Sequence, residues 1–213
     1  MIGEQCIPAG MIRLPKTQAA LAYAERLHAR QTRRVDGAPF IVHPLEVACL
    51  LFDAGAPDHV IAAGALHDVI EKTDADAADL RARFGAAVTR LVLAVTEDRS
   101  ISSHTARKAA LREQVAKAGD DAMMVFAADK ISKVRELGLE HAATRQPRPP
   151  AGRAAFSRRQ RLAHYGASLL LLEEFLPDSP LVIQLRTELE AIIARWAASP
   201  AARLSNPPFR VPS

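Results

Sequence analysis

An apolar stretch that ends in a histidine and an aspartate is the strongest constraint on how this chain folds. Residues 62–72 read AAGALHDVIEK, so small and aliphatic side chains lead directly into His67 and Asp68. If the stretch is helical, Glu71 lies one turn beyond both residues on the same face, and Lys72 follows Asp68 at i+4. A buried aspartate requires a partner or a metal ion. One turn of helix is therefore expected to offer an imidazole, two carboxylates and an ammonium group to one small volume.

The rest of the sequence favours an all-α fold. Glycines are sparse, alternation of the strand type is nearly absent, and alanine and leucine dominate the apolar residues. Hydrophobic periodicity and helix breakers predict helices at 17–34, 45–54, 58–70, a short segment ending at 84–85, 88–95, 105–118, 122–137, 156–175 and 180–197.

The length of 213 residues fits one generous domain or two small ones. We expect a leader at 1–14, one helical domain at 15–198 and a flexible, proline-containing tail at 199–213. A proline-rich basic stretch at 145–161 reads as a solvated loop. It could mark a boundary, but the two helices after it look like part of the same bundle.

The composition limits the partners and the compartment. The net charge of +4 permits an anionic substrate without requiring nucleic acid, and no basic run is interleaved with aromatic residues. No signal peptide is visible, and no apolar run is long enough to cross a membrane. The two cysteines are far apart and suit a reducing environment. We therefore expect a cytoplasmic protein with a small-molecule partner; the sequence does not indicate an oligomeric state.

Three separate segments supply residues of the kind that bind metal ions. His43 is expected in extended backbone just before a helix that Pro44 begins, and Asp129 comes from an apolar helical stretch. With His67 and Asp68 they would make a mixed nitrogen and oxygen shell, which suits Mn²⁺, Fe²⁺ or Zn²⁺ better than Ca²⁺. Taken singly, His43 could cap a helix start.

Asp129 could likewise form an ion pair with Lys133 or Arg135 instead of binding a metal. The remaining histidines are interpreted as solvated or packing residues.

The order of these motifs resembles the hydrolase domain of the RelA/SpoT alarmone family, within the HD metal-dependent phosphohydrolases, over about residues 23–175. It is most similar to the small stand-alone alarmone hydrolases. The matching segments are Tyr23-Ala24, Arg34 to Ala48 (R-x-x-G-x-P-F-I-x-H-P-L-x-V-A), Ala65 to Glu71 (ALHDVIE), Phe84-Gly85, Val95-Thr96-Glu97, Arg107-Lys108 and Ala127 to Lys130 (AADK).

The resemblance implies a helical HD-domain bundle that binds a divalent ion, Mn²⁺ in the family, through His43, His67, Asp68 and Asp129. It implies removal of the 3′-pyrophosphate from the guanosine polyphosphate ppGpp, which yields GDP and pyrophosphate. Of the catalytic positions, Glu71 would position or deprotonate the attacking water, and Lys72 stands beside it.

Five further residues match or neighbour positions that contact the substrate in the family. Arg34 would stack on the guanine, and Tyr165 would hold the nucleoside. Lys108 and Arg161 would hold phosphate, and Lys133 stands near the 3′-phosphate. Without the family, the other four would be ordinary surface or packing residues, whereas Lys133 stands out by its adjacency to a proposed ligand.

Two positions depart from the family pattern. The family has a Glu-Asp pair where this chain has Glu71-Lys72, and an asparagine where it has Lys133. The two lysines could point at bound phosphate, or they could pair with Asp68 and Asp129 and weaken metal binding. Two alternatives therefore remain open: a hydrolase of another small nucleotide, and a nucleotide-binding protein without turnover.

Overall fold

The computed structural model describes residues 8–143 and 153–197, and in these ranges the chain is helical with no extended strand. Its elements are η1 (Met11–Arg13), α1 (Pro15–His28), α2 (Val42–Asp53), α3 (Asp58–Leu66), α4 (Val69–Lys72), α5 (Ala77–Val95), α6 (His104–Ala118), α7 (Asp120–Ala143), α8 (Arg153–Phe175) and α9 (Pro180–Ala197). The prediction of an all-α fold is confirmed.

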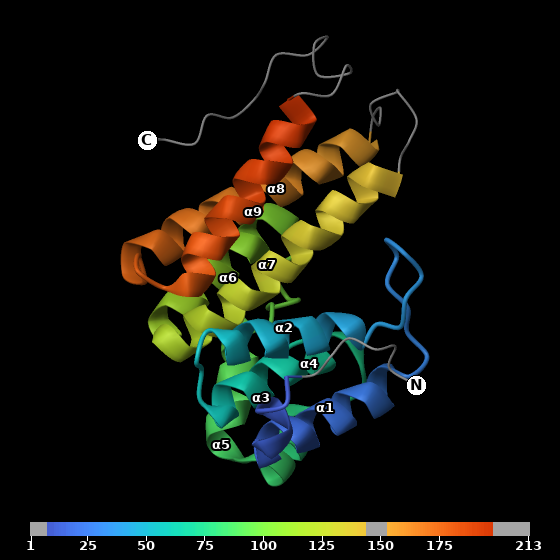
Figure 1. Cartoon of the computed structure of the whole chain (residues 1–213), viewed down its shortest axis with the longest axis vertical. Helices are drawn as coiled ribbons and strands as arrows, with labels where there is room; N and C mark the ends of the chain where they lie inside the picture. Colours follow the sequence, from blue (N-terminus) through green and yellow to red (C-terminus); the bar gives the residue numbers. More distant parts are fainter. Residues whose placement is uncertain (1–7, 144–152, 198–213) are drawn as a thin grey trace.

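The helices form two groups that the long helix α7 joins (Figure 1). Helices α1 to α5 lie together in the lower part of the view, and α6 to α9 lie in the upper part. Helix α7 packs against α2, α3 and α5 on one side and against α6, α8 and α9 on the other. The two groups therefore share one continuous hydrophobic core.

Helix α3 is the buried centre of the lower group. It packs against α1, α2, α5 and α7, and every residue from Val60 to Leu66 is buried. This explains why its sequence is apolar on all sides, since a helix without a solvent face needs no polar stripe. Gly64 allows α2 to approach closely, because a Cβ atom at this position would lie 2.3 Å from Leu51 Cδ1.

The helix expected at 58–70 is interrupted at the histidine and the aspartate, so the prediction of one continuous helix was wrong. Helix α3 ends at Leu66 and α4 begins at Val69. The Gly64 carbonyl, which the next turn of a continuous helix would use, accepts a hydrogen bond from His67 Nδ1 at 2.7 Å. The side chain thus takes over a backbone acceptor and ends the helix.

His43 also differs from the expectation, because it lies in the first turn of α2 and not in extended backbone before it. Pro44 is tolerated there, since the first N–H groups of a helix have no partner within the helix. Helix α1 stops at His28, so Arg34 belongs to the connection to α2. Gly85, at φ 81°, kinks α5 between the two segments that the sequence predicted separately.

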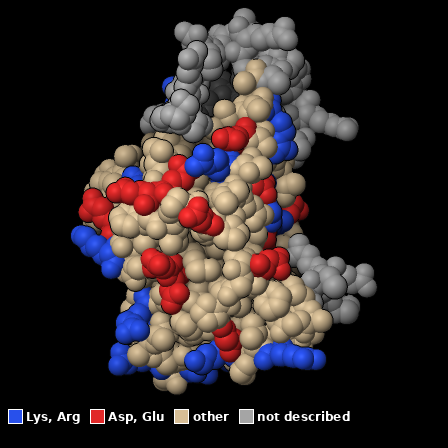
Figure 2. Space-filling model, turned by 60° about the vertical axis from the view of Figure 1, so that its left-hand side comes forward, with Lys and Arg blue, Asp and Glu red and all other residues tan. Residues whose placement is uncertain are grey.

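Residues 1–7 of the expected leader, the whole tail at 199–213 and residues 145–152 of the proline-rich stretch fall outside the described residues. Residues 153–161 of that stretch belong to α8, so the prediction of a loop was wrong there. Within 8–14, η1 carries Met11, whose side chain is fully buried. None of the helices in the described ranges combines the length and the hydropathy that a membrane span needs. The face in Figure 2 carries acidic and basic side chains side by side, without an unbroken basic stripe.

Candidate metal centre

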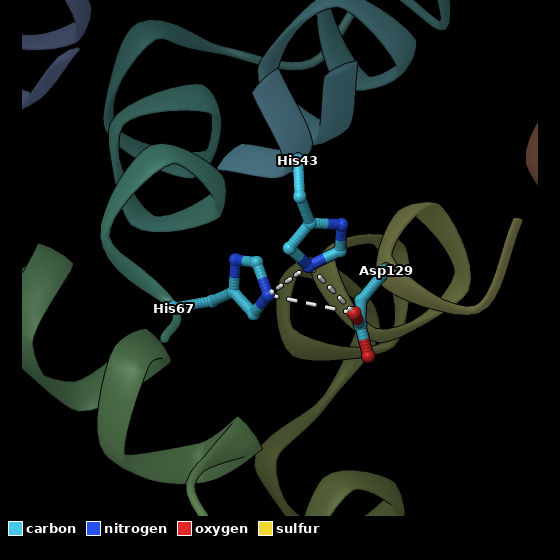
Figure 3. A group of neighbouring side chains, drawn as sticks. All are labelled: His43, His67 and Asp129. Atoms are coloured by element: carbon cyan, nitrogen blue, oxygen red, sulfur yellow. Dashed lines mark hydrogen bonds and ion pairs between the residues drawn. The ribbon is translucent and has the colours of Figure 1, made fainter. Parts of the chain in front are cut away.

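Side chains from two parts of the lower group and from α7 converge on one point. His43 comes from the first turn of α2, His67 and Asp68 from the break after α3, and Asp129 from the middle of α7. Figure 3 shows the two imidazole rings and the Asp129 carboxylate pointing toward one another. Both histidines are buried, at 0% and 5% exposure. The structure thus brings together the four residues that the sequence suggested.

The two imidazole nitrogens and one oxygen of Asp129 lie within a few ångströms of one another, and Asp68 flanks the two nitrogens. The Nε2 atoms of His43 and His67 are 3.1 Å apart, and Asp129 Oδ1 lies 3.3 Å from the first and 3.4 Å from the second. Asp68 Oδ2 lies 3.5 Å from each of the same two nitrogens. These separations of 3.1–3.5 Å are those expected for ligand atoms about 2.1 Å from a shared ion.

Hydrogen bonds on the far side of each ring fix which nitrogen faces this point. His67 Nδ1 donates to the Gly64 carbonyl, so its Nε2 carries a lone pair. His43 Nδ1 lies 2.8 Å from Ser132 Oγ, and that hydroxyl donates its own proton to Glu46 Oε2 at 2.6 Å. Ser132 must then accept from His43 Nδ1, which also leaves a lone pair on His43 Nε2.

Two lone pairs that face each other at 3.1 Å require a cation between them. Burial lowers the pKa of His67, but Asp68 and Asp129 outweigh it and leave that pKa raised, so a proton can take this place. The pKa of His43 is lowered by burial. Asp68 Oδ2 is buried and has no hydrogen-bond partner among the described residues. Two imidazoles, two carboxylates and an orphaned oxygen fit a divalent transition metal ion.

Glu71 lies beside this group on α4. Its Oε1 accepts a hydrogen bond from the Glu97 backbone N–H at 2.7 Å, so the connection after α5 orients the carboxylate. Burial raises its pKa, and the negative charge of Asp68 adds to the effect. A carboxylate held in this way is a better proton acceptor than one in open water.

The two lysines that follow the aspartates by four residues behave differently. Lys72 Nζ lies 3.8 Å from Asp68 Oδ1. Lys133 does not pair with Asp129; its nearest recorded carboxylate is Glu136, at 3.5 Å. Asp129 Oδ2 is instead 2.5 Å from Lys130 Nζ, and burial is outweighed by Lys130 and the two histidines, which hold the pKa of Asp129 well below its usual value.

The remaining sequence-predicted residues are spread around the group and do not contact it in one cluster. Arg34 is exposed in the connection before α2. Lys108 forms an ion pair with Glu97, and Arg161 makes two bonds to Glu140, at 2.9 Å and 2.7 Å. Tyr165 is buried at 6% exposure, and burial raises its pKa, so its hydroxyl stays neutral.

Two supporting residues were missed by the sequence analysis. Ser132 and Glu46 hold the His43 ring, and Arg135 in turn donates to Glu46 Oε1 at 2.8 Å. The signal was present, because Glu46 follows His43 by three residues and Ser132 follows Asp129 by three, the spacing of neighbours on one helix face. From the sequence, only charged partners of Asp129 were expected, so the serine three residues after it was not noticed.

A comparison with protein families matches residues 20–150 of the chain to the HD domain. This range includes all four candidate ligands. The chain belongs to the HD-domain family. The two histidines and two aspartates lie within the part of the chain that matches this family. The family resemblance seen in the sequence is confirmed.

Curated relatives narrow the family further. The chain is 38% identical over 121 residues to the human guanosine-3′,5′-bis(diphosphate) 3′-pyrophosphohydrolase MESH1, a match that covers 55% of the chain and 67% of the human protein. It is 47% identical over 78 residues to a probable enzyme of the same name from Synechocystis, which covers 37% of the chain but only 10% of that longer protein.

Solved structures agree with the family. A structure described as a metazoan ortholog of SpoT that hydrolyzes ppGpp matches with a TM-score of 0.70 and 27% identity, over 83% of this chain and 95% of that one. A protein from Listeria monocytogenes matches with a TM-score of 0.59 and 28% identity, over 70% of this chain and 92% of that one. The HD-domain helical arrangement is thus shared over most of the described chain.

Proposed function

We propose that the chain is a divalent-metal-dependent phosphohydrolase that removes the 3′-pyrophosphate from guanosine-3′,5′-bis(diphosphate). The observation that carries the proposal is the pair of inward-facing imidazole Nε2 atoms, 3.1 Å apart and flanked by the buried Asp68 and the partly buried Asp129. Relatives that bear this activity in their names are similar to this chain, the human protein over 121 residues at 38% identity.

His43, His67, Asp68 and Asp129 would hold the ion, which we propose is Mn²⁺. When bound, such an ion supplies positive charge that stabilises a developing negative charge on phosphoryl oxygen and makes water more acidic. Asp68 suits this role because its Oδ2 already faces both histidines. The hydrogen bonds that the Nδ1 atoms of His43 and His67 make to Ser132 and Gly64 keep both rings in the orientation that an ion requires.

Glu71 would accept the proton of the attacking water. Its raised pKa brings the carboxylate closer to the range in which it can take and release a proton near neutral pH. The water oxygen forms a bond to the 3′-linked phosphorus, the bond from phosphorus to the 3′ oxygen breaks, and that oxygen takes up a proton. The products are GDP and pyrophosphate.

The nucleotide would be held by residues around the group. Arg34 offers an exposed guanidinium plane for stacking on guanine. Tyr165 stays a neutral hydroxyl donor, and Lys108 and Arg161 would exchange their carboxylate partners for phosphate. We further propose that the protein acts in the cytoplasm, where such a nucleotide is available.

The test is release of pyrophosphate from ppGpp by the purified chain with Mn²⁺. The Asp129→Asn variant removes a candidate ligand and should lower the rate by more than about 100-fold, since even outer-shell partners change metal sites by about 10–100-fold. Asp120→Asn, at the exposed start of the same helix, is the matched control and should keep the natural rate.

The proposal fails if the natural chain releases no pyrophosphate from ppGpp with Mn²⁺. Recovery of turnover in Lys72→Asp would then assign the loss to the lysine. Cleavage of a different nucleotide in a panel would point to another hydrolase, and tight nucleotide binding without turnover would point to a binding protein.

A further inference from the structure

Two lysine ammonium groups from different helices lie over the same aromatic ring next to the candidate metal centre. Lys72 Nζ, from the end of α4, is 5.3 Å from the centre of the Phe40 ring, and Lys133 Nζ, from α7, is 5.9 Å from it. Phe40 itself is 9% exposed, and its ring centre is 5.8 Å from that of His43. The aromatic ring therefore brings two positive charges to the edge of the metal ligands.

These two lysines are held more loosely than the other cations near the site. Their nearest recorded carboxylate oxygens lie at 3.8 Å and 3.5 Å, beyond the ~2.7–2.9 Å that is typical of a charge-assisted hydrogen bond. Lys130, by contrast, lies 2.5 Å from Asp129 Oδ2. Lys108 and Arg161 are each closely paired with a glutamate. A new anion would displace fewer existing contacts at Lys72 and Lys133.

The arrangement is also open to solvent on the Lys72 side. The side chains of Lys72 and Lys133 are 35% and 26% exposed, so both ammonium groups remain partly hydrated. Lys72 lines a cavity of about 490 Å³, in which Arg26 is the other basic residue and Asp74, Asp76 and Asp79 are acidic. An anion can therefore reach the lysine without unfolding any helix.

Two like charges over one ring repel each other, and an aromatic face offsets only part of this repulsion. A ligand with two adjacent anionic groups would remove it, since each ammonium group could bind one of them. We propose that Lys72 and Lys133, seated on Phe40, form a paired cationic site that binds a diphosphate group beside the metal ligands. The choice of diphosphate as the natural ligand rests on the proposed function; the presence of the anion site does not.

The test measures binding of inorganic pyrophosphate and inorganic phosphate to the full chain without metal, by isothermal titration calorimetry. Pyrophosphate should bind at least about tenfold more tightly than phosphate, because the second charged contact is worth about tenfold or more. Lys72→Gln and Lys133→Gln should each weaken pyrophosphate binding by about tenfold, and the difference should shrink at high salt.

Phe40→Leu keeps both lysines but removes the ring, and it should weaken pyrophosphate binding by about threefold, as expected for loss of cation–π contacts at partly exposed sites. Lys117→Gln, an exposed lysine near the end of α6, is the control for the loss of one positive charge and should bind like the natural chain. Far-ultraviolet circular dichroism and the melting temperature verify that each variant is folded.

The inference is overturned if the folded Lys72→Gln, Lys133→Gln double variant binds pyrophosphate as the Lys117→Gln control does. It is equally overturned if the natural chain binds phosphate as tightly as pyrophosphate, or binds neither. Lysine-dependent pyrophosphate binding combined with no cleavage of ppGpp would reject the proposed function and leave the anion site standing.

Discussion

Ser132 orients a candidate metal ligand, His43, without being a ligand itself. Its hydroxyl accepts a hydrogen bond from His43 Nδ1 and donates one to Glu46, which also accepts a hydrogen bond from Arg135. This chain of bonds fixes the tautomer of His43 and presents its Nε2 lone pair to the buried group. A residue without charge thereby decides whether a histidine can act as a ligand.

Replacing Ser132 with alanine removes this control. We expect Ser132→Ala to lower the affinity for Mn²⁺ by about 10–100-fold, the usual effect of losing a bond behind a ligating histidine. Calorimetric titration with Mn²⁺ measures this directly. Ser168→Ala is the control, because Ser168 is also a buried serine but donates to the backbone carbonyl of His164 on α8, a helix that supplies no candidate ligand. Equal affinities in the two variants would contradict the assigned role.

At the residue scale, the sequence was informative for residue types that are rarely buried without a partner or a metal ion. A histidine followed by an aspartate in an apolar segment indicated ligands, and the structure places His43 and Asp129 beside them. The sequence could not tell that Lys133 would face Glu136 and the Phe40 ring and not pair with Asp129. A lysine on a helix can reach acidic residues three or four positions before or after it, and the spacing does not say which one it contacts. Ser132 escaped notice because serine has many ordinary roles.

Among the elements, α3 is the one whose packing positions the site. Its close contact with α2 depends on Gly64, since a Cβ atom there would lie 2.3 Å from Leu51 Cδ1 and 3.2 Å from Val47 Cγ1. The same residue supplies the carbonyl that orients His67. Packing and ligand orientation therefore meet in one turn of helix.

The variant Gly64→Ala should lower the free energy of unfolding by about 1–3 kcal/mol, the usual cost of overpacking a core. Gly166→Ala is the control in α8, where an added Cβ atom meets nothing within 4 Å. That variant should raise stability by about 0.4–1 kcal/mol, because alanine loses less conformational freedom in a helix. Urea unfolding compares the two. Similar effects in both variants would show that α2 and α3 do not pack as described.

Helix positions were predictable from apolar periodicity, and α9 was predicted at its observed bounds. The break between α3 and α4 was not predictable in this way. It arises because the His67 side chain bonds to the Gly64 carbonyl, and apolar periodicity does not reveal such a bond. The early end of α1 was also not predicted, and there backbone groups bond to one another in the following turn. The residues after His28 are tied into a turn in which Arg33 N donates to the Ala38 carbonyl at 2.8 Å.

At the scale of the whole molecule, the candidate site lies where the two helix groups meet, since α7 contributes Asp129 to ligands from α2 and α3. The upper group also buries His164 of α8. Its ring packs near Phe126 of α7, and its Nδ1 lies 3.0 Å from Arg112 of α6. Burial, with the charges of Lys130, Lys108 and Arg112, lowers the pKa of His164 to about 2.

This burial makes the packing of α6, α7 and α8 within the upper group sensitive to acid. In the unfolded chain His164 takes up a proton near pH 6.5, whereas in the folded chain it stays neutral, so stability is present above pH 6.5 and is lost as the pH falls toward 2. The loss should approach about 1.4 kcal/mol per pH unit. His164→Leu should show a correspondingly shallower decline between pH 6 and 4 in urea unfolding without metal. Parallel declines would contradict the assignment.

The account depends most on one divalent ion held by His43, His67, Asp68 and Asp129. The direct measurement is an anomalous difference map from crystals of the chain grown with Mn²⁺. It should show a single strong peak in contact with the two Nε2 atoms and with both aspartates. A map without a peak there, in which the Lys72 ammonium group occupies the place among the four side chains, would contradict the metal centre and the hydrolase proposed from it.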